Sequence, residues 1–221
     1  MQDRYAGDVG DFGKLGMLRA IESSGLTVGI NWYLAGDESC NNDGKHLGYL
    51  DDKKFRGCDD ELLNALAYML EQGTRSVKEI EELNLLRSCT YYHEKIANPK
   101  SPKGNARREW HQKGLDALKE CELVFLDPDN GMIPKSVSTG SEKSIKYVLP
   151  EEILDYYEAG HSVVFYSHRT REQLDVYLTR FARLFDEAEN KGATIKGVTF
   201  KRGTVRDYIF LLHQEHLQKV V

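Results

Sequence analysis

Short apolar runs alternate along this chain with stretches in which apolar residues recur at helical spacing. Four of the runs read as buried strands: residues 26–34, 88–96, 124–126 and 162–167. The amphipathic stretches predict helices over residues 12–23, 62–70, 76–87 and 106–119, and another from residue 150. Strands that alternate with helices indicate an α/β fold, in which a mostly parallel sheet is covered on both faces.

Local signals place some of the helix starts. Asp11 stands where it can cap the first helix, and Pro150 is well tolerated in a first turn. Thr170 and Gln173 have the spacing of a capping box. The helix that they predict carries apolar residues along one side: Leu174, Tyr177, Leu178, Phe181 and Phe185.

The end of the chain departs from the alternation. Residues 195–200 and 208–213 are both strand-like and flank Arg202-Gly203, which predicts a closing antiparallel pair. We therefore expect residues 1–221 to form a single α/β domain. Its architecture would be a Rossmann-like three-layer sandwich with a mostly parallel sheet and a C-terminal antiparallel hairpin.

Composition narrows the class of protein further. The 221 residues are 40% hydrophobic, enough for one substantial core, and the net charge of −5 gives no overall basic field. The four cysteines are scattered without a C-x-x-C pair, and no apolar run reaches membrane-spanning length. We expect a cytoplasmic protein with reduced thiols and no membrane partner, and the oligomeric state is left open.

The strand at 124–126 stops on Asp127-Pro128-Asp129-Asn130. In α/β proteins ligands bind beyond the carboxyl ends of the strands, so this run would aim two carboxylates and an amide at a crevice. The candidate catalytic residues are Asp127, Pro128, Asp129 and Asn130. The alternative is a simple strand-end turn, with Asp127 capping backbone amides and Asn130-Gly131 reversing the chain.

The predicted topology resembles the Rossmann-like sheet of class I methyltransferases that use S-adenosylmethionine. In the amino methyltransferases of that fold, a strand ends in Asp/Asn-Pro-Pro-Tyr/Phe, and residues 127–130 match the first two positions and miss the last two. The resemblance implies that Asp127 hydrogen-bonds a target amine on a nucleic acid. No aromatic residue at position 130 would stack on a flipped base.

Residues 5–14 carry a second likeness. They resemble the Ala-Gly-Asn-x-x-Asp-x-x-Lys segment of the ribosomal RNA adenine methyltransferases of the RlmJ family, with Asp8 in place of asparagine and Leu15 in place of a following histidine. The resemblance implies that this segment lies beside the cofactor. The implied cofactor-binding residues are Gly7, Asp8, Asp11 and Lys14. If the segment does not bind a cofactor, its sequence predicts only a glycine-rich turn and a helix cap.

The first strand departs from the methyltransferase pattern. A glycine-rich turn normally follows it and lets the backbone approach the cofactor, but here Gly36 is the only glycine, and Asp37 follows it. Gly36 and Asp37 are the candidates for that turn, while Trp32 and Tyr33 read as core or as an adenine platform. Because of this departure, two alternatives to an active methyltransferase remain: a degenerate relative and a non-catalytic binding module.

Basic residues concentrate just before the Asp127 strand. Residues 95–113 hold six Lys or Arg and one acid, which indicates either a phosphate-binding strip or a solvated face. A smaller basic set follows the strand at 162–167. The candidate phosphate ligands are Lys103, Arg107, Arg108, His168 and Arg169.

The same acids support a different chemistry. Asp8, Asp11, Asp127 and Asp129, with Asp37, could gather around Mg²⁺ and hydrolyse a phosphodiester. The segment Phe125–Asp129 also resembles the Asp-x-Asp strand end of haloacid-dehalogenase-type phosphatases, although the threonine that follows there is missing. The hypotheses are thus a methyltransferase acting on a nucleic-acid amine, a magnesium-dependent phosphohydrolase or nuclease, and a non-catalytic binding module.

Overall fold

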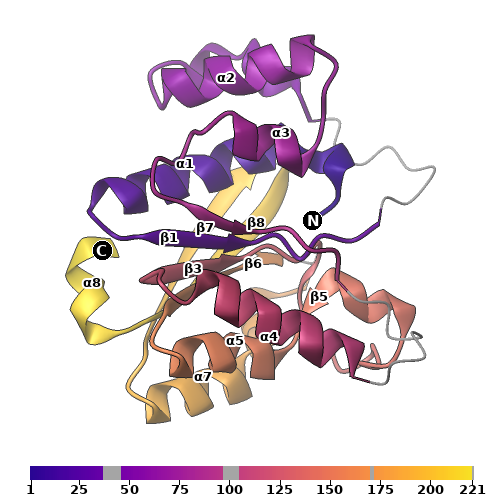
Figure 1. Ribbon diagram of the computed structural model, residues 1–221, viewed down its shortest axis with the longest axis vertical. Coiled ribbons are helices and arrows are strands. Elements are labelled where there is room, and N and C mark those ends of the chain that lie inside the picture. Colours follow the sequence, from indigo (N-terminus) through magenta and orange to yellow (C-terminus); the bar gives the residue numbers. More distant parts are fainter. Residues whose placement is uncertain (37–45, 97–104, 170–171, 221) are drawn as a thin grey trace.

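The computed structural model describes residues 1–36, 46–96, 105–169 and 172–220, which fold around a six-stranded sheet (Figure 1). In spatial order its strands are β2 (Thr90–Tyr92), β1 (Val28–Asn31), β3 (Leu123–Leu126), β6 (Ser162–His168), β8 (Thr204–Leu212) and β7 (Thr194–Arg202). The first four are mutually parallel, and β8 runs antiparallel to both β6 and β7. The predicted Rossmann-like α/β sheet with a C-terminal antiparallel hairpin is confirmed.

Helices cover both faces of the sheet (Figure 1). One face carries α1 (Val9–Ser23), α2 (Asp60–Glu71) and α3 (Val77–Glu82), and the other carries α4 (Ala106–Leu118), α5 (Pro150–Glu158) and α7 (Ala182–Asn190). The smaller elements are α6 (Leu174–Leu178), α8 (Gln214–Val220), a strand pair of β4 (Gly131–Met132) with β5 (Tyr147–Val148), and the 3-10 turns η1 (Asp3–Tyr5), η2 (Gly48–Leu50), η3 (Lys53–Phe55) and η4 (Glu142–Lys146). Among the described residues, no helix combines the length and apolarity needed to cross a bilayer.

Strand β3 shows why the sequence gives three layers. Successive side chains of a strand point to opposite faces, so an entirely apolar strand must be buried on both. Leu123 and Phe125 pack into the core beneath α1 and α2, whereas Val124 and Leu126 pack into the core with α4 and α5. Each of these four side chains is fully buried.

The first helix begins earlier than the sequence pattern predicts, and its cap is a different residue. The Asp8 carboxylate accepts hydrogen bonds from the backbone N–H groups of Gly10 and Asp11, so α1 begins at Val9. Asp11, the predicted cap, lies in the first turn and accepts from the N–H of Gly7 instead. The prediction of Asp11 as the cap was therefore wrong, and its carboxylate faces back along the chain.

Two predicted helices are shorter in the structure. The helix expected over 76–87 ends at Glu82, and Asn84 just beyond it has the left-handed φ of +50°. The helix expected after Gln173 divides into α6 and α7, so Leu174 and Leu178 lie in α6 and are 50% and 44% exposed. Gln173 makes no side-chain capping bond, and Thr170 lies outside the described residues. Pro150 occupies the first turn of α5, as predicted.

The parallel strands end together at one edge of the sheet. From β1 the chain continues to β2 on one side, while β3 pairs on the other, so the strand order reverses between β1 and β3. The N-terminus lies at this carboxyl edge, and α8 lies at the opposite edge (Figure 1). A reversal of this kind opens a crevice in which α/β proteins bind their ligands.

Candidate functional site

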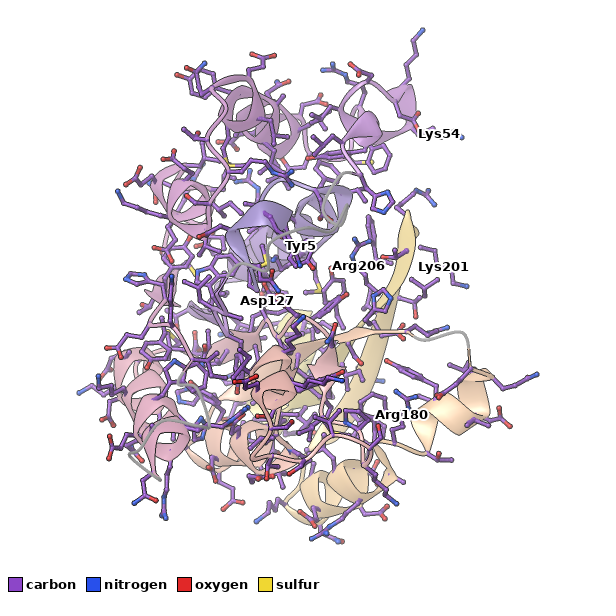
Figure 2. The ribbon with its side chains drawn as sticks, turned by 90° about the vertical axis from the view of Figure 1, so that its right-hand side faces the viewer. Tyr5, Lys54, Asp127, Arg180, Lys201 and Arg206 are labelled. Atoms are coloured by element: carbon purple, nitrogen blue, oxygen red, sulfur yellow. The ribbon has the colours of Figure 1, made fainter. Side chains whose placement is uncertain are left out.

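A cavity of about 370 Å³ opens at the carboxyl edge of the sheet. Figure 2 shows Tyr5, Asp127 and Arg206 on this side of the molecule. The lining comes from the start of α1, the segment after β3, the end of β6 and the start of β8. Its charged members are Asp8, Asp11, Lys14, Asp127, Asp129 and Arg206. The acids that the sequence places far apart thus line one cavity.

Lys14 joins two of these acids. Its ammonium group lies 2.6 Å from Oδ1 of Asp11 and 2.7 Å from Oδ2 of Asp127, and its side chain is almost fully buried. Burial disfavours the charge on Lys14, but the two carboxylates outweigh this and raise its pKa above the ordinary value. The Lys14 side chain therefore carries its positive charge at neutral pH and fixes both carboxylates.

Asp127 keeps hydrogen-bonding capacity toward the cavity. Its backbone N–H donates to the carbonyl of Asn31, which holds the residue at the end of the sheet. Among the described residues only Lys14 donates to the side chain, and it does so at Oδ2. Burial raises the pKa of Asp127, and Lys14 reduces that rise. A carboxylate accepts several hydrogen bonds, so Oδ1 can serve a ligand.

Asp129 is bound by the first residues of the chain. The Met1 amino group lies 2.9 Å from Oδ1 of Asp129, and Nε2 of Gln2 donates to Oδ2 at 2.5 Å. Burial alone would raise the pKa of Asp129, but the Met1 amino group and Gln2 hold it below the ordinary value. Asp129 is thus a charged partner of the chain's own amine.

Asp8 and Arg206 form the far wall of the cavity. Nη2 of Arg206 lies 3.4 Å from Oδ2 of Asp8, while its Nη1 donates to the carbonyl of Arg202. The approach needs a glycine on α1, because a Cβ at Gly10 would lie 2.5 Å from Nε of Arg206. Burial and the nearby Asp11 carboxylate together raise the pKa of Asp8. Perturbed carboxyl groups around a cavity are typical of functional sites.

The turn after β1 does not offer an open cradle for S-adenosylmethionine. Trp32 and Tyr33 are fully buried, and Tyr33 adopts a left-handed φ of +46°. The Met1 amino group donates to the carbonyl of Tyr33, and the Met1 carbonyl accepts from the N–H of Ala35. Met1 therefore already occupies the carbonyl of Tyr33 and the N–H of Ala35, and the described part of this turn leaves little room for S-adenosylmethionine.

The other predicted cofactor residues are divided between two places. Asp8, Asp11 and Lys14 line the cavity, but Gly7 faces α2, where a Cβ would lie 2.7 Å from the Met69 side chain. Gly36 is exposed and lies outside the cavity lining. Asp37 lies outside the described residues.

The acids are paired with cations of the protein rather than arranged for a metal. Within the described ranges, no group of three or more His, Cys, Asp or Glu side chains has an arrangement that could hold a metal ion. Lys14 lies between Asp11 and Asp127, and the Met1 amino group neutralises Asp129. These cations of the protein thus occupy carboxylate oxygens that Mg²⁺ would take as ligands.

Two predicted phosphate ligands are bound by acids of the protein itself. Arg107 forms a two-point ion pair with Glu152, at 2.6 and 2.9 Å, and donates to the carbonyls of Ser144 and Tyr147. Arg169 makes the same kind of pair with Asp207, at 2.7 and 2.6 Å. These contacts use the guanidinium donors that a phosphate would need.

The remaining phosphate candidates are spread over the molecule. Arg108 is exposed on α4, which covers the face of the sheet opposite α1 (Figure 1). His168 lines the cavity, and its Nδ1 lies 3.1 Å from the Tyr166 hydroxyl. Lys103 lies outside the described residues. Of the members of this set that the structure describes, only His168 lines the cavity.

Sequence reasoning missed a group of residues that line the cavity: Met1, Tyr5, Tyr166, Arg206 and Tyr208. The predicted hairpin carried a usable signal. An antiparallel strand begins at the edge where its parallel neighbours end, so the start of β8 had to lie beside the end of β6. The register pairs His168 with Arg206 and confirms that placement.

No protein-family model matches the chain, and no curated protein matches its sequence.

Proposed function

We propose that this chain is a methyltransferase-like protein that binds the exocyclic amine of a nucleic-acid base in the carboxyl-edge cavity. The observation that carries the proposal is the placement of Asp127, which Lys14 fixes through Oδ2 while the side chain lines the cavity. An amine donates hydrogen bonds, and a carboxylate held in this way is a ready acceptor.

The charge balance of the cavity also favours an amine. Four carboxylates face three positive groups, and each positive group is already paired with at least one carboxylate. Capacity for further hydrogen bonding therefore lies mainly on oxygen acceptors. A phosphate would have to compete with Asp8 for Arg206 and with Asp129 for the Met1 amine, at the cost of leaving a carboxylate unpaired.

Aromatic side chains suit the cavity to a flat base. Tyr5, Tyr166 and Tyr208 contribute to the lining, and Tyr5 and Tyr166 are partly exposed. They supply aromatic faces that the residue at position 130 does not. A volume of about 370 Å³ lies within the range of small-molecule pockets.

The test compares adenosine with inosine, in which a carbonyl replaces the exocyclic amine. Adenosine should raise the melting temperature, because a ligand that binds only the folded state stabilises it. Inosine should raise it much less, since its carbonyl would face the Asp127 carboxylate. Asp127→Asn keeps an acceptor oxygen and should retain adenosine binding, whereas Asp127→Ala should lose it. Equal binding of the two nucleosides would refute amine recognition.

Two further ligands in the same assay test the other hypotheses. Stabilisation by S-adenosylhomocysteine would show that the turn after β1 opens to a methyl donor, and stabilisation by Mg²⁺ would support the hydrolase hypothesis. Adenosine binding without a response to either would identify a binding module that keeps the substrate side of the site.

A further inference from the structure

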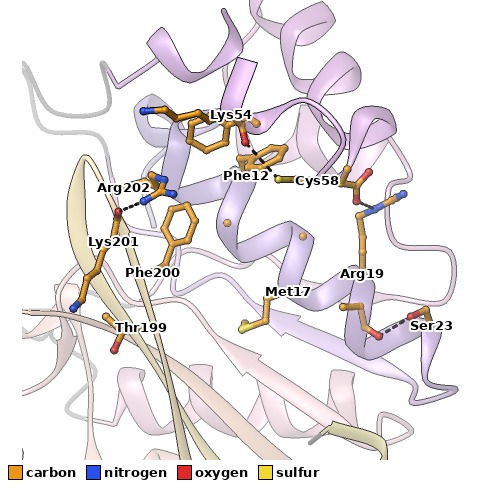
Figure 3. Close-up of a pocket in the computed structure, with 15 residues that line it drawn as sticks. Phe12, Met17, Arg19, Ser23, Lys54, Cys58, Thr199, Phe200, Lys201 and Arg202 are labelled. Carbon is orange, nitrogen blue, oxygen red and sulfur yellow. Dashed lines mark hydrogen bonds and ion pairs between the residues drawn. The ribbon is translucent and has the colours of Figure 1, made fainter. Parts of the chain in front are cut away.

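A second hollow, of about 750 Å³, lies between α1 and β7 (Figure 3). We call it the α1–β7 groove. Its α1 wall includes Gly13 and Gly16, its β7 wall runs from Thr199 to Arg202, and η3 closes it with Lys54 and Phe55. The groove shares no lining residue with the carboxyl-edge cavity.

The groove is basic although the chain is acidic. Four basic residues and one acid line it, whereas the whole chain has a net charge of −5. The acid, Asp59, is bound by Arg19 at 2.7 Å. The other three cations, Lys54, Lys201 and Arg202, are exposed and have no ion-pair partner among the described residues. Their positive charge is thus available to an anionic ligand.

Aromatic rings form part of the groove. The Phe200 ring packs over Gly13, where a Cβ would lie 2.9 Å from it, and Phe200 remains partly exposed. Phe12 and Phe55 pack edge to face behind it, with ring centroids 5.5 Å apart. Figure 3 shows Phe200 beside Arg202 and Lys201 on β7, with Phe12 and Lys54 on the other side of the groove. Phe12 and Phe55 are buried, so Phe200 is the ring of the groove that offers an aromatic face beside the cations, which suits a ligand with flat rings and negative charges.

The groove continues to the amine site through the β7–β8 turn. Arg202 lines the groove, and its carbonyl accepts from Arg206, which lines the cavity. Along α1, Gly10 lies beneath Arg206 and Gly13 beneath Phe200. A chain-like ligand seated in the groove would therefore reach the cavity at the start of α1.

We propose that the α1–β7 groove binds the sugar-phosphate backbone and stacked bases of single-stranded nucleic acid. The inference rests on the proposed amine site and deepens it, because it identifies the polymer that presents the amine. An acidic polypeptide would satisfy the cations but would not use the face of the Phe200 ring. The groove follows α1 for roughly 17 Å, which spans a few nucleotides.

The experiment uses fluorescein-labelled octamers of thymidine and of uridine, whose bases lack an exocyclic amine and so report on the groove alone. Binding is followed by anisotropy at several salt concentrations. The variant combines Lys54→Gln, Lys201→Gln and Arg202→Gln. Removing three phosphate contacts should lower the slope of log K against log salt by about 2, and the affinity on the order of 10- to 100-fold.

A matched triple variant, the α4 triple, removes the same charge from α4 and the segments next to it. It combines Arg108→Gln on α4, Lys119→Gln just after the helix and Lys95→Gln after β2, and all three residues are exposed in the structure. The proposal predicts that this variant binds both octamers nearly as well as the wild type, apart from the effect of net charge. If the α4 triple weakens binding as much as the groove triple does, the groove is not the binding surface.

Phe200 tests the stacking contribution. Phe200→Ala should weaken octamer binding roughly 5- to 150-fold, while Phe200→Tyr should retain most of it, because a phenol ring still stacks. Circular dichroism checks that each variant is folded. Should Phe200→Ala unfold the protein, the tyrosine variant still decides, since a loss of binding by a folded Phe200→Tyr contradicts stacking at this position.

The remaining outcomes separate the two proposals. Binding of either octamer supports the groove, and a preference between them identifies RNA or DNA as the ligand. Failure of both octamers to bind, or their displacement by polyglutamate at equal charge, refutes the groove. Adenosine binding is measured independently of both, so the amine site can fail while the groove stands, and the groove can fail while the amine site stands.

Discussion

Lys14 and Asp127 lie 113 residues apart in the sequence, yet the Lys14 ammonium group and Oδ2 of Asp127 are 2.7 Å apart in the fold. Helix α1 supplies the amine and the end of β3 supplies the carboxylate. Because Lys14 also binds Asp11, one ammonium group holds the N-terminal segment and the central strand at a common edge.

Lys14→Met should destabilise the protein by about 3–5 kcal/mol at neutral pH, because it leaves the buried carboxylates of Asp11 and Asp127 without their cation. Urea denaturation measures the free energy of unfolding. The loss should shrink on acidification, since protonated carboxyls no longer need the cation. Adding Asp127→Asn to Lys14→Met should restore part of the stability at neutral pH, and no recovery would contradict the ion-pair account.

Asp127 and Asp129 should give opposite pH dependence. The raised pKa of Asp127 means that its contribution to stability is present below its ordinary pKa of 3.8 and is lost as pH rises through the higher folded pKa. The free energy of unfolding of Asp127→Asn should therefore increase relative to that of the wild type as pH rises above about 4.

Asp129 provides the comparison within the same loop. Its lowered pKa means that its contribution is present above the ordinary value of 3.8 and is lost as pH falls through the lower folded pKa. The difference between wild type and Asp129→Asn should stay constant between about pH 5 and about pH 7 and decrease in stronger acid. Parallel urea titrations over this range check both signs.

Gly131→Ala should destabilise the protein by roughly 3 kcal/mol, because it combines backbone strain with a steric clash. Gly131 has a φ of +97°, and an added Cβ would lie 2.7 Å from the Cα of Ser167. Gly192→Ala is the matched control, since Gly192 has a φ of +87° but nothing within 4 Å of an added Cβ. It should cost only about 1 kcal/mol. Equal losses would mean that the contact with Ser167 is relieved.

Arg107→Met should affect stability rather than ligand binding. It removes the partner of Glu152, whose side chain is 4% exposed, and such a loss costs about 3–5 kcal/mol. Arg108→Gln, one residue along α4 and exposed, should change the free energy of unfolding by less than about 0.5 kcal/mol. Octamer binding by folded Arg107→Met should remain at the wild-type level. If the folded Arg107→Met variant lost octamer binding, Arg107 would be a phosphate ligand, as the sequence predicted.

Regular patterns in the sequence were enough to predict the frame of the site. The apolar run before Asp127 indicates a buried strand, and strand ends in such folds share one edge, so the position of Asp127 followed from the pattern. The terminal hairpin was predictable for the same reason, because two strand-like segments flank Arg202-Gly203. These features depend on local sequence and on general rules of topology.

Other parts of the site depend on contacts that no local pattern encodes. Asp8 and Asp11 have equally suitable side chains for a cap, and in the structure Asp8 takes the role, directly after Gly7 with its left-handed φ of +79°. The ion pairs of Arg107 with Glu152 and of Arg169 with Asp207 join separate elements, so a basic segment alone did not reveal that these side chains are engaged.

The β7–β8 turn carries Phe200 and Arg202 on one side and Arg206 on the other. One short connection therefore sets the spacing between the groove proposed to bind the nucleic-acid backbone and the cavity proposed to bind the base. Inserting or deleting a residue in this turn would change the distance between the α1–β7 groove and the cavity. A different nucleotide of the bound nucleic acid would then be presented to Asp127.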